Sequence, residues 1–242
     1  MLAPWHNATI VSIEDITDNT RIFRAQLPDA DNFSFRAGQF MTFDLPIHEK
    51  RNKRWRSYSI ASAPDTGNIL EFVIVASEQG MGTRYLFEDV KVGTAISMRG
   101  PQGIFTLPDP LPTDKILCFV CTGTGIAPFR SILHDLRNSH QAHPPIHLIF
   151  GTRYEHQILY GNDMQQLTRD LDLHYHVALS RETPPNFTGH RGYVHSIYEQ
   201  LFAAHPPASF YLCGWRNMVT EAQQRLLQMG YDRRDIHLES YD

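Results

Sequence analysis

The chain has 242 residues, of which 42% are hydrophobic and 20% are charged, which is ordinary for a globular protein. Its formal net charge of −4 gives no reason to expect binding to nucleic acid or to an anionic membrane. The sequence shows no apolar run of the roughly 20 residues that a membrane-spanning helix needs, and no secretory signal pattern, so we expect a cytoplasmic protein.

The first part of the chain, residues 1–108, is predicted to form short strands separated by turn residues. The β-rich segments are 8–13, 22–27, 39–45, 57–61, 71–76 and 95–98. Strands at this spacing favour an antiparallel six-stranded barrel. One helix is expected over 83–89, after Gly80-Met81-Gly82.

The prolines at 108, 110 and 112 mark a predicted domain boundary, because they fit neither a helix nor a sheet. Beyond them, over 112–242, apolar runs alternate with helical patterns, as in a doubly wound parallel sheet. The runs are 116–121, 146–150, 173–179 and 209–213, and the helical patterns are 128–138, 162–170, 194–203 and 216–228. Ligands bind such sheets at the carboxyl ends of the strands.

Cysteine and histidine give no pattern typical of a metal site, so we expect no metal. The pair Cys118-x-x-Cys121 lies inside an apolar run, and we interpret it as small buried strand residues. The 13 histidines are scattered along the chain, apart from His174 and His176, which alternate on one strand face. We interpret the histidines as solvated surface residues.

Two segments are candidates for cofactor binding, although each has an ordinary structural alternative. Gly123 and Gly125 follow an apolar run and precede Pro128, as expected where a phosphate meets a helix N-terminus. The spacing differs from G-x-G-x-x-G, so the turn is equally compatible with a tight connection. In the segment 56–59, Arg56 and Tyr58 share one strand face and suit a phosphate and a flat ring. The alternative is an ordinary strand, because strands often contain tyrosine and the arginine can be solvated.

Taken in order, several segments resemble the ferredoxin–NADP reductase family from about residue 8 to the C-terminus. They are Arg56-Ser57-Tyr58-Ser59, 72–76, 80–83, 100–103, 123–133, Ser180-Arg181-Glu182, 211–214 and 239–241. The resemblance implies an antiparallel six-stranded Greek-key flavin-binding barrel over 1–108. It implies an NADP(H)-binding α/β domain with a doubly wound parallel sheet over 112–242.

The resemblance also implies which residues bind the flavin. Arg56 would contact the pyrophosphate, Tyr58 would stack on the isoalloxazine and Ser59 would lie near N5. The backbone around Val73 and Val75 would bind the ribityl portion. Gly82 and Thr83 would hold the pyrophosphate at a helix N-terminus. FAD is expected rather than FMN, because 80–83 supplies a second phosphate-binding element.

For the nicotinamide, the resemblance places the glycine turn of Gly123 and Gly125 at the nucleotide. Thr124 would lie where flavin and nicotinamide meet. The hydride-transfer site would comprise Ser59, Cys213 and Glu239, with Gly214 beside it. Tyr241 would cover the second face of the flavin, although Asp242 follows it where plant-type members end in the aromatic residue.

The choice of NADPH over NADH depends on the segments at 180–181 and 191–193. The resemblance to NADPH-using relatives implies that Ser180 and Arg181 hold the 2′-phosphate together with Arg191. It also implies that Tyr193 stacks on adenine. These residues favour NADPH. The alternative is that Arg181 is a surface arginine paired with Glu182.

The expected activity is hydride transfer between NADPH and FAD, followed by transfer of single electrons to a separate acceptor. Cations at 50, 51, 53, 54 and 56 favour an acidic ferredoxin or flavodoxin, although the segment also fits a solvated loop in which only Arg56 is engaged. The alternatives are a reductase component for an oxygenase, desaturase or haem protein, a free flavin reductase, and a non-catalytic flavin- and nucleotide-binding subunit of an electron-transfer complex.

Overall fold

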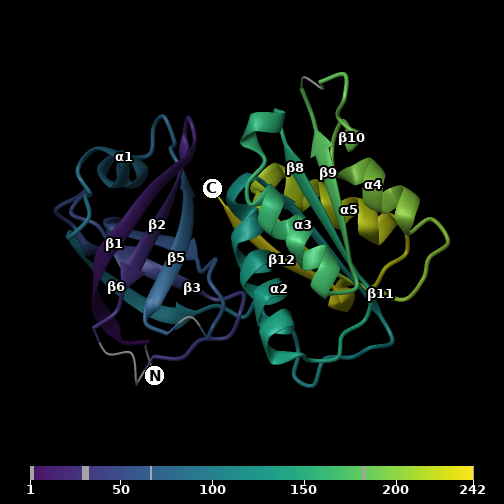
Figure 1. Cartoon of the computed structure of the whole chain (residues 1–242), viewed down its shortest axis with the longest axis horizontal. Helices are drawn as coiled ribbons and strands as arrows, with labels where there is room; N and C mark the ends of the chain where they lie inside the picture. The colour runs from purple at the N-terminus through teal and green to yellow at the C-terminus, as the bar shows by residue number, and fades with distance from the viewer. Residues whose placement is uncertain (1–2, 29–32, 66, 182–183, 242) are drawn as a thin grey trace. The chain divides into compact units, whose positions relative to one another are not determined.

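The computed structural model describes residues 3–28, 33–65, 67–181 and 184–241. The chain divides into two compact units, and Figure 1 draws the first 106 residues in purple to blue and the rest of the chain in teal to yellow. The β unit contains residues up to Thr106 together with Ala127–Asp135. The α/β unit contains Leu107–Ile126 and the residues from Leu136 onward.

The β unit is built on a six-stranded sheet with the order β4-β3-β6-β1-β2-β5, and every pair in it is antiparallel. The strands are β1 (Trp5–Thr17), β2 (Thr20–Gln26), β3 (Phe40–Asp44), β4 (Trp55–Ser59), β5 (Ile69–Val75) and β6 (Ala95–Gln102). Strands distant in sequence, such as β3 and β6, lie side by side, as in a Greek key. The antiparallel six-stranded prediction is confirmed.

The sheet curves like a barrel but is not closed, because the strand order leaves β4 and β5 as its two edges. Just beyond β4, the Ala61 amide donates to the Glu71 carbonyl on β5 at 2.8 Å. The Glu71 amide donates in turn to Ser62 Oγ at 3.2 Å. The edges therefore meet at one end only, and each edge strand pairs through its backbone with a single neighbour.

The core of the β unit contains side chains from all six strands and from α1 (Met81–Glu88). Leu70, Phe72 and Ile74 of β5 alternate into it, so Val73 and Val75 face the other way. Tyr58 packs against this core, with its ring 4.9 Å from that of Phe43.

The α/β unit contains a parallel sheet with the order β10-β9-β8-β7-β11-β12. The strands are β7 (Ile116–Thr122), β8 (Ile146–Thr152), β9 (Leu173–Leu179), β10 (His190–Arg191), β11 (Ala208–Trp215) and β12 (Ile236–Tyr241). The chain runs outward from β7 to β10 and then returns to β11, so the order reverses between β7 and β11. This reversal defines a doubly wound sheet and marks where such sheets bind ligands.

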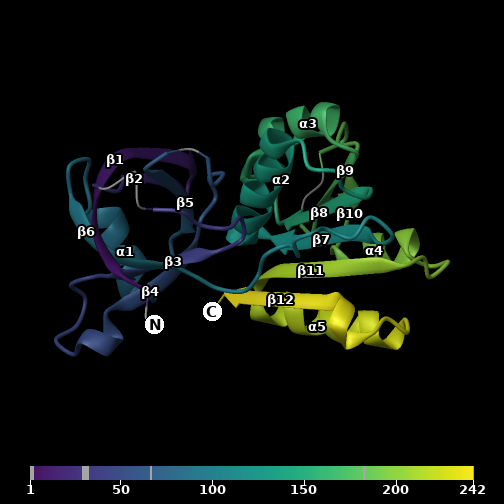
Figure 2. The same ribbon diagram turned by 90° about the horizontal axis from the view of Figure 1, so that it is seen from below.

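Helices connect the strands of this sheet: α2 (Ala127–Ser139), α3 (Gly161–Asp170), α4 (His195–Leu201) and α5 (Arg216–Gln228). Figure 2 shows the sheet nearly edge-on, with α3 on one side and α5 on the other. Helices α4 and α5 pack in one apolar cluster that includes Phe202 and Leu226, against Val120 and Leu212 of the sheet.

The predicted helices and longer strands all occur within a few residues of their expected bounds. The sequence did not predict the short β10 or the last strand, β12. After the buried Ile236, strand β12 alternates half-buried and exposed residues because it forms the outer edge of the sheet, and its pattern is too short to stand out. Among the described residues, no helix is long and apolar enough to cross a bilayer.

Candidate functional site

In the β unit, the structure brings Arg56 and Gly82 together. The Arg56 side chain passes over the start of α1 so closely that a Cβ atom on Gly82 would lie 2.9 Å from Arg56 Cγ. Arg56 Nη1 donates to the carbonyls of Lys53, at 3.1 Å, and Trp55, at 2.7 Å. A guanidinium is thus held at a helix N-terminus, and both are suited to an anionic group.

Helix α1 offers backbone donors at this point. Its first i to i−4 hydrogen bond runs from the Arg84 amide to the Gly80 carbonyl, so the amides of residues 81–83 precede the helical ladder. The Thr83 hydroxyl is engaged locally, because it donates to the Gly80 carbonyl at 3.1 Å and accepts from the Ser77 amide at 3.0 Å. Thr83 can therefore contribute its backbone amide to a phosphate site. Its side chain holds the loop at residues 77–80 in place.

The other residues predicted to bind flavin lie on the two edge strands. Ser59 ends β4 and is 5% exposed, and Val73 and Val75 lie on β5. Burial raises the pKa of the Tyr58 hydroxyl, while the charge of Arg56 acts in the opposite direction. Tyr58 is therefore a neutral ring at physiological pH. The edge strands β4 and β5 therefore carry the predicted flavin residues that do not belong to α1.

A buried ion cluster in the β unit was not predicted. The Glu71 carboxylate is 6% exposed and lies 2.8 Å from Arg24 Nε and 3.3 Å from Arg130 Nη1. Arg130 also donates to the Ala61 carbonyl at 2.8 Å, and Ser131 Oγ donates to the Ser62 carbonyl at 2.7 Å. These contacts attach the first turns of α2 to the β unit. The sequence gives no signal for them, because the partners are far apart along the chain.

The cationic segment before β4 is partly neutralised. Asp44 lies 2.8 Å from Arg54 Nε and 3.6 Å from Arg51 Nε. Arg51 also lies over the ring of Trp5, at 5.4 Å. The interpretation that only Arg56 is engaged is therefore wrong. Lys50, Arg51 and Lys53 remain exposed in this segment, and of these three Arg51 is paired with Asp44.

In the α/β unit, the predicted glycines meet at the reversal of strand order. Residues Gly123–Ile126 form a single 3-10 turn between β7 and α2. A Cβ atom on Gly125 would collide with the Cys213 carbonyl and lie 2.8 Å from Gly214 Cα. Gly214, with a φ of 140°, would place a Cβ 2.5 Å from Thr122 Oγ1. The glycines let β7 and β11 approach each other at the carboxyl edge of the sheet.

Two of the residues predicted to serve hydride transfer, Cys213 and Glu239, are brought together here with Tyr241. Cys213 of β11 pairs in register with Glu239 of β12. The Cys213 thiol is fully buried, and its pKa is raised by burial and by the charge of Glu239, while a hydrogen bond with Tyr241 acts against the rise. The thiol is therefore neutral and unsuited to nucleophilic chemistry. Asp242 lies outside the described residues.

The residues predicted to bind the 2′-phosphate gather at the ends of β9 and β10. Ser180 follows β9, and its amide and Oγ both donate to the Thr152 carbonyl, at 3.0 and 3.3 Å. Arg191 pairs in register with Leu179, one residue before Ser180. Arg181 and Arg191 are both exposed, and Tyr193 is 68% exposed. Glu182, the alternative partner of Arg181, lies outside the described residues.

The interpretation of the histidines as solvated is wrong for several of them. His134 and His195 are buried, at 9% and 7% exposure. His147 and His176 are half-buried, and His147 Nδ1 lies 3.1 Å from His176 Nε2. Cys118 and Cys121 are buried strand residues, as predicted. In the described part of the chain, no group of three or more potential ligands is arranged to hold a metal ion.

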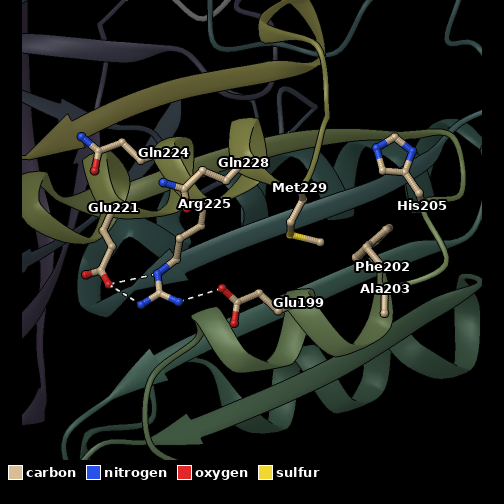
Figure 3. A pocket seen from close by; sticks show the side chains of 9 residues that line it. All are labelled: Glu199, Phe202, Ala203, His205, Glu221, Gln224, Arg225, Gln228 and Met229. Atoms are coloured by element: carbon tan, nitrogen blue, oxygen red, sulfur yellow. Dashed lines mark hydrogen bonds and ion pairs between the residues drawn. The ribbon is translucent and has the colours of Figure 1, made fainter.

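A pocket of about 670 Å³ lies between α4 and α5 (Figure 3). Arg225 lies in it between two carboxylates, 2.7 Å from Glu199 and 2.8 Å from Glu221. Hydrogen bonds from these carboxylates raise the pKa of Arg225. None of the residues predicted to bind cofactors is among those that line this pocket. We therefore interpret the pocket as a gap in the packing of α4 against α5.

Two family models together match most of the chain. The oxidoreductase FAD-binding domain matches residues 7–107, and the oxidoreductase NAD-binding domain matches residues 119–224. Ferredoxin–NADP reductase B of Sorangium cellulosum is 33% identical over 244 residues, and the match covers 97% of each protein. The chain belongs to the ferredoxin–NADP reductase family. It is a flavoprotein oxidoreductase that uses FAD and a nicotinamide dinucleotide.

Further relatives of this reductase differ in how much of their length the match covers. The phenol hydroxylase P5 protein of Acinetobacter pittii is 29% identical, and the match covers 98% of this chain and 65% of that protein. A ferredoxin–NADP⁺ reductase from Neisseria gonorrhoeae with bound FAD and NADP has a TM-score of 0.81 at 25% identity, over 98% of both chains. The family therefore includes both stand-alone reductases and parts of longer proteins.

The residues of this reductase fit the two cofactors. In the β unit, Arg56 over Gly82 forms a cationic cradle that a side chain at position 82 would fill. In the α/β unit, Gly125 and Gly214 are buried and let β7 and β11 pack closely at the point where doubly wound sheets bind dinucleotides. Arg191 pairs with Leu179 at the end of β9, which Ser180 and Arg181 follow, and both arginines are exposed.

Proposed function

We propose that this reductase prefers NADPH and passes single electrons to a small acidic carrier, a ferredoxin or a flavodoxin, in the cytoplasm. The observation that supports NADPH is the register of β10, which sets Arg191 beside the end of β9 where Ser180 and Arg181 follow. Two guanidinium groups and a hydroxyl at one sheet edge are suited to a phosphate dianion.

Each domain has its own role in the proposal. Residues 1–108 bind FAD and residues 112–242 bind NADP(H). When bound, FAD accepts a hydride from NADPH and releases electrons singly. Arg56 and the amides at the start of α1 hold its pyrophosphate, Tyr58 stacks on the ring and the backbone at Val73 and Val75 binds the ribityl chain. Ser59 donates a hydrogen bond near N5.

The nucleotide domain positions the nicotinamide. Gly123, Thr124 and Gly125 bind the dinucleotide backbone, and Tyr193 stacks on adenine. Cys213 packs against the nicotinamide as an uncharged thiol and excludes water. Glu239 holds or relays a proton, and Tyr241 occupies the place of the nicotinamide when none is bound.

The acceptor is the least constrained part of the proposal. Lys50 and Lys53 are exposed cations at one end of β4, whereas Arg51 and Arg54 are paired with Asp44. Exposed cations steer an acidic partner and make association depend on salt. The alternative, a reductase component for an oxygenase or haem protein, is supported by the likeness to the phenol hydroxylase P5 protein.

The activity is tested by mixing the FAD-loaded protein with NADPH or NADH without oxygen and following the flavin absorbance near about 450 nm. We expect faster bleaching with NADPH. Faster bleaching with NADH would overturn the preference. Salt-dependent reduction of ferredoxin or flavodoxin would support the carrier, and reduction of oxygenase components alone would support the alternative.

The phosphate contact is tested with Arg181→Ala. We expect a loss of NADPH affinity by about ten- to hundred-fold, the equivalent of a lost charged hydrogen bond, with little change for NADH. Arg169→Ala is the matched control, because Arg169 is an exposed arginine at the far end of α3. Equal losses for NADPH and NADH would show that Arg181 does not contact the phosphate.

A further inference from the structure

A row of four imidazole rings in contact, called the stack below, crosses one face of the α/β sheet from β8 to β10. His147 stacks on His174, with ring centroids 4.9 Å apart, and on His176, with centroids 5.3 Å apart. His190 of β10 lies at the end of the row, with its ring centroid 5.6 Å from that of His176 and its plane tilted by 53°. Their strands are neighbours and their side chains share the face on which α4 and α5 pack.

The last ring of the stack belongs to a very short strand. Strand β10 has two residues, His190 and Arg191, and pairs only with Ala178 and Leu179 of β9. The Gly192 amide adds one hydrogen bond to the Leu179 carbonyl, at 2.8 Å. An edge strand of this length has little backbone pairing of its own. The contact of His190 with His176 adds a side-chain contact to the pairing that positions Arg191.

The link between His147 and His176 depends on protonation. Their facing nitrogens lie 3.1 Å apart, so one must donate and the other must accept. If both rings are protonated, both facing nitrogens carry hydrogen and the bond is lost. Two positive charges then lie within the stack, with His174 and His190 as further titratable neighbours.

The surroundings of the stack do little to accommodate such charge. Asp172 is the acidic group facing it, 3.6 Å from His174 Nε2 and half-exposed at the far end from His190. Phe202 meets His147 edge-on, and the buried Cys118 is the β7 neighbour of His147. Burial, followed by the charges of neighbouring histidines, lowers the pKa of His147 and lowers that of His176 to about 4.

We propose that the stack of His174, His147, His176 and His190 is a pH-sensitive positioning element for Arg191. The neutral stack holds β10 against β9, and protonation of both His147 and His176 in acid releases β10 and weakens selection for the 2′-phosphate. His176 and His190 are positioning residues in this scheme. The inference rests on the proposed role of Arg191 in binding the 2′-phosphate.

The experiment compares binding of 2′,5′-ADP and 5′-AMP to the FAD-loaded protein by calorimetry across the acidic range. The variant is His176→Gln, because a glutamine amide can hydrogen-bond to His147 without titrating. The control is His140→Asn, because His140 is exposed at the end of α2 with a φ of 52° that asparagine tolerates. Titration of the ligand phosphate is common to all three proteins and cancels in the comparison.

We expect the preference for 2′,5′-ADP to fall more steeply with acid in the wild type and in His140→Asn than in His176→Gln. Across the acidic range, the loss of preference for 2′,5′-ADP should be about ten-fold larger in the wild type than in His176→Gln, which corresponds to a shift of one pKa unit. Exchange of the Gly192 amide, corrected for its intrinsic pH dependence, should accelerate over the same range in the wild type. Identical pH profiles for wild type and His176→Gln would overturn the inference.

Arg191→Ala separates this inference from the proposed function. If Arg191→Ala keeps the full preference at pH 8, the assignment of Arg191 fails and the inference fails with it. If Arg191→Ala loses the preference while His176→Gln keeps the wild-type pH profile, the inference alone fails. Should His176→Gln not fold, His190→Gln at the sheet edge serves in its place, together with the Gly192 exchange in the wild type.

Discussion

At the scale of single residues, Gly125 shows why a glycine stands in the nucleotide turn. A Cβ atom at this position would collide with the Cys213 carbonyl of β11. We predict that Gly125→Ala lowers the free energy of unfolding by about 1 to 3 kcal/mol through overpacking and weakens NADPH binding. Gly123→Asn is the control, because a Cβ there meets open space and asparagine tolerates the φ of 53°. Urea unfolding measures the free energy of unfolding of both variants. Equal losses of stability for the two would refute the steric explanation.

The cysteines give a second prediction at this scale. Cys118, Cys121 and Cys213 are fully buried, and burial raises the pKa of each thiol, so the reactive thiolate is scarce at pH 8. We expect the native protein to resist alkylation by iodoacetamide and to react at all three positions once unfolded. Mass spectrometry of the labelled protein gives the result. Rapid labelling of native Cys213 would show that its thiol is accessible or ionised.

At the scale of elements, Glu71 joins β5 to β2 and to the start of α2. Its carboxylate is 6% exposed and pairs with Arg24 and Arg130. We predict that Glu71→Ala lowers the free energy of unfolding by about 3 kcal/mol, because two guanidinium groups lose a buried partner. Glu88→Ala is the control, since its pair with Arg84 is exposed and contributes little. Similar losses for the two variants would show that burial of Glu71 is unimportant.

The elements also show how far sequence patterns reach. Strand β7 is a continuous apolar run because a central parallel strand is buried on both faces, and the run was predicted. Strand β10 was not predicted, because two residues make no pattern and only β9 beside them makes a strand. The same holds for the histidines. Alternation along the strand predicts that His174 and His176 share one face. The registers of β8 and β10 with β9 then bring His147 and His190 to the same face.

At the scale of the whole molecule, the titration of buried histidines sets the response of stability to acid. Burial lowers the pKa of His147, His176 and His195, and that of His176 falls to about 4 from an ordinary 6.5. Below pH 6.5 the unfolded chain binds more protons than the folded one, so stability is present above that value and is lost as the pH falls toward 4. Urea unfolding between these limits should show a steady decrease, and His176→Gln should reduce its slope. A flat profile would contradict the lowered pKa values.

The sequence by itself determined which functional segments the chain contains and their order along the chain. The alternating and continuous apolar patterns, the prolines at 108–112 and the ordered segments from Arg56 to Tyr241 were enough to predict both halves and the family. Local patterns suffice for these features because hydrophobic periodicity and turn residues act over a few neighbouring positions.

The tertiary structure alone decided which residues became neighbours. It placed Arg56 over Gly82, set Gly125 against Cys213 and Gly214, paired Glu71 with Arg130 and stacked the histidines across three strands. Each of these contacts joins residues that are distant along the chain, and strand order and register bring them together. A single sequence carries no local signal for such pairs, because their energy arises only once the sheet has formed and water has been excluded.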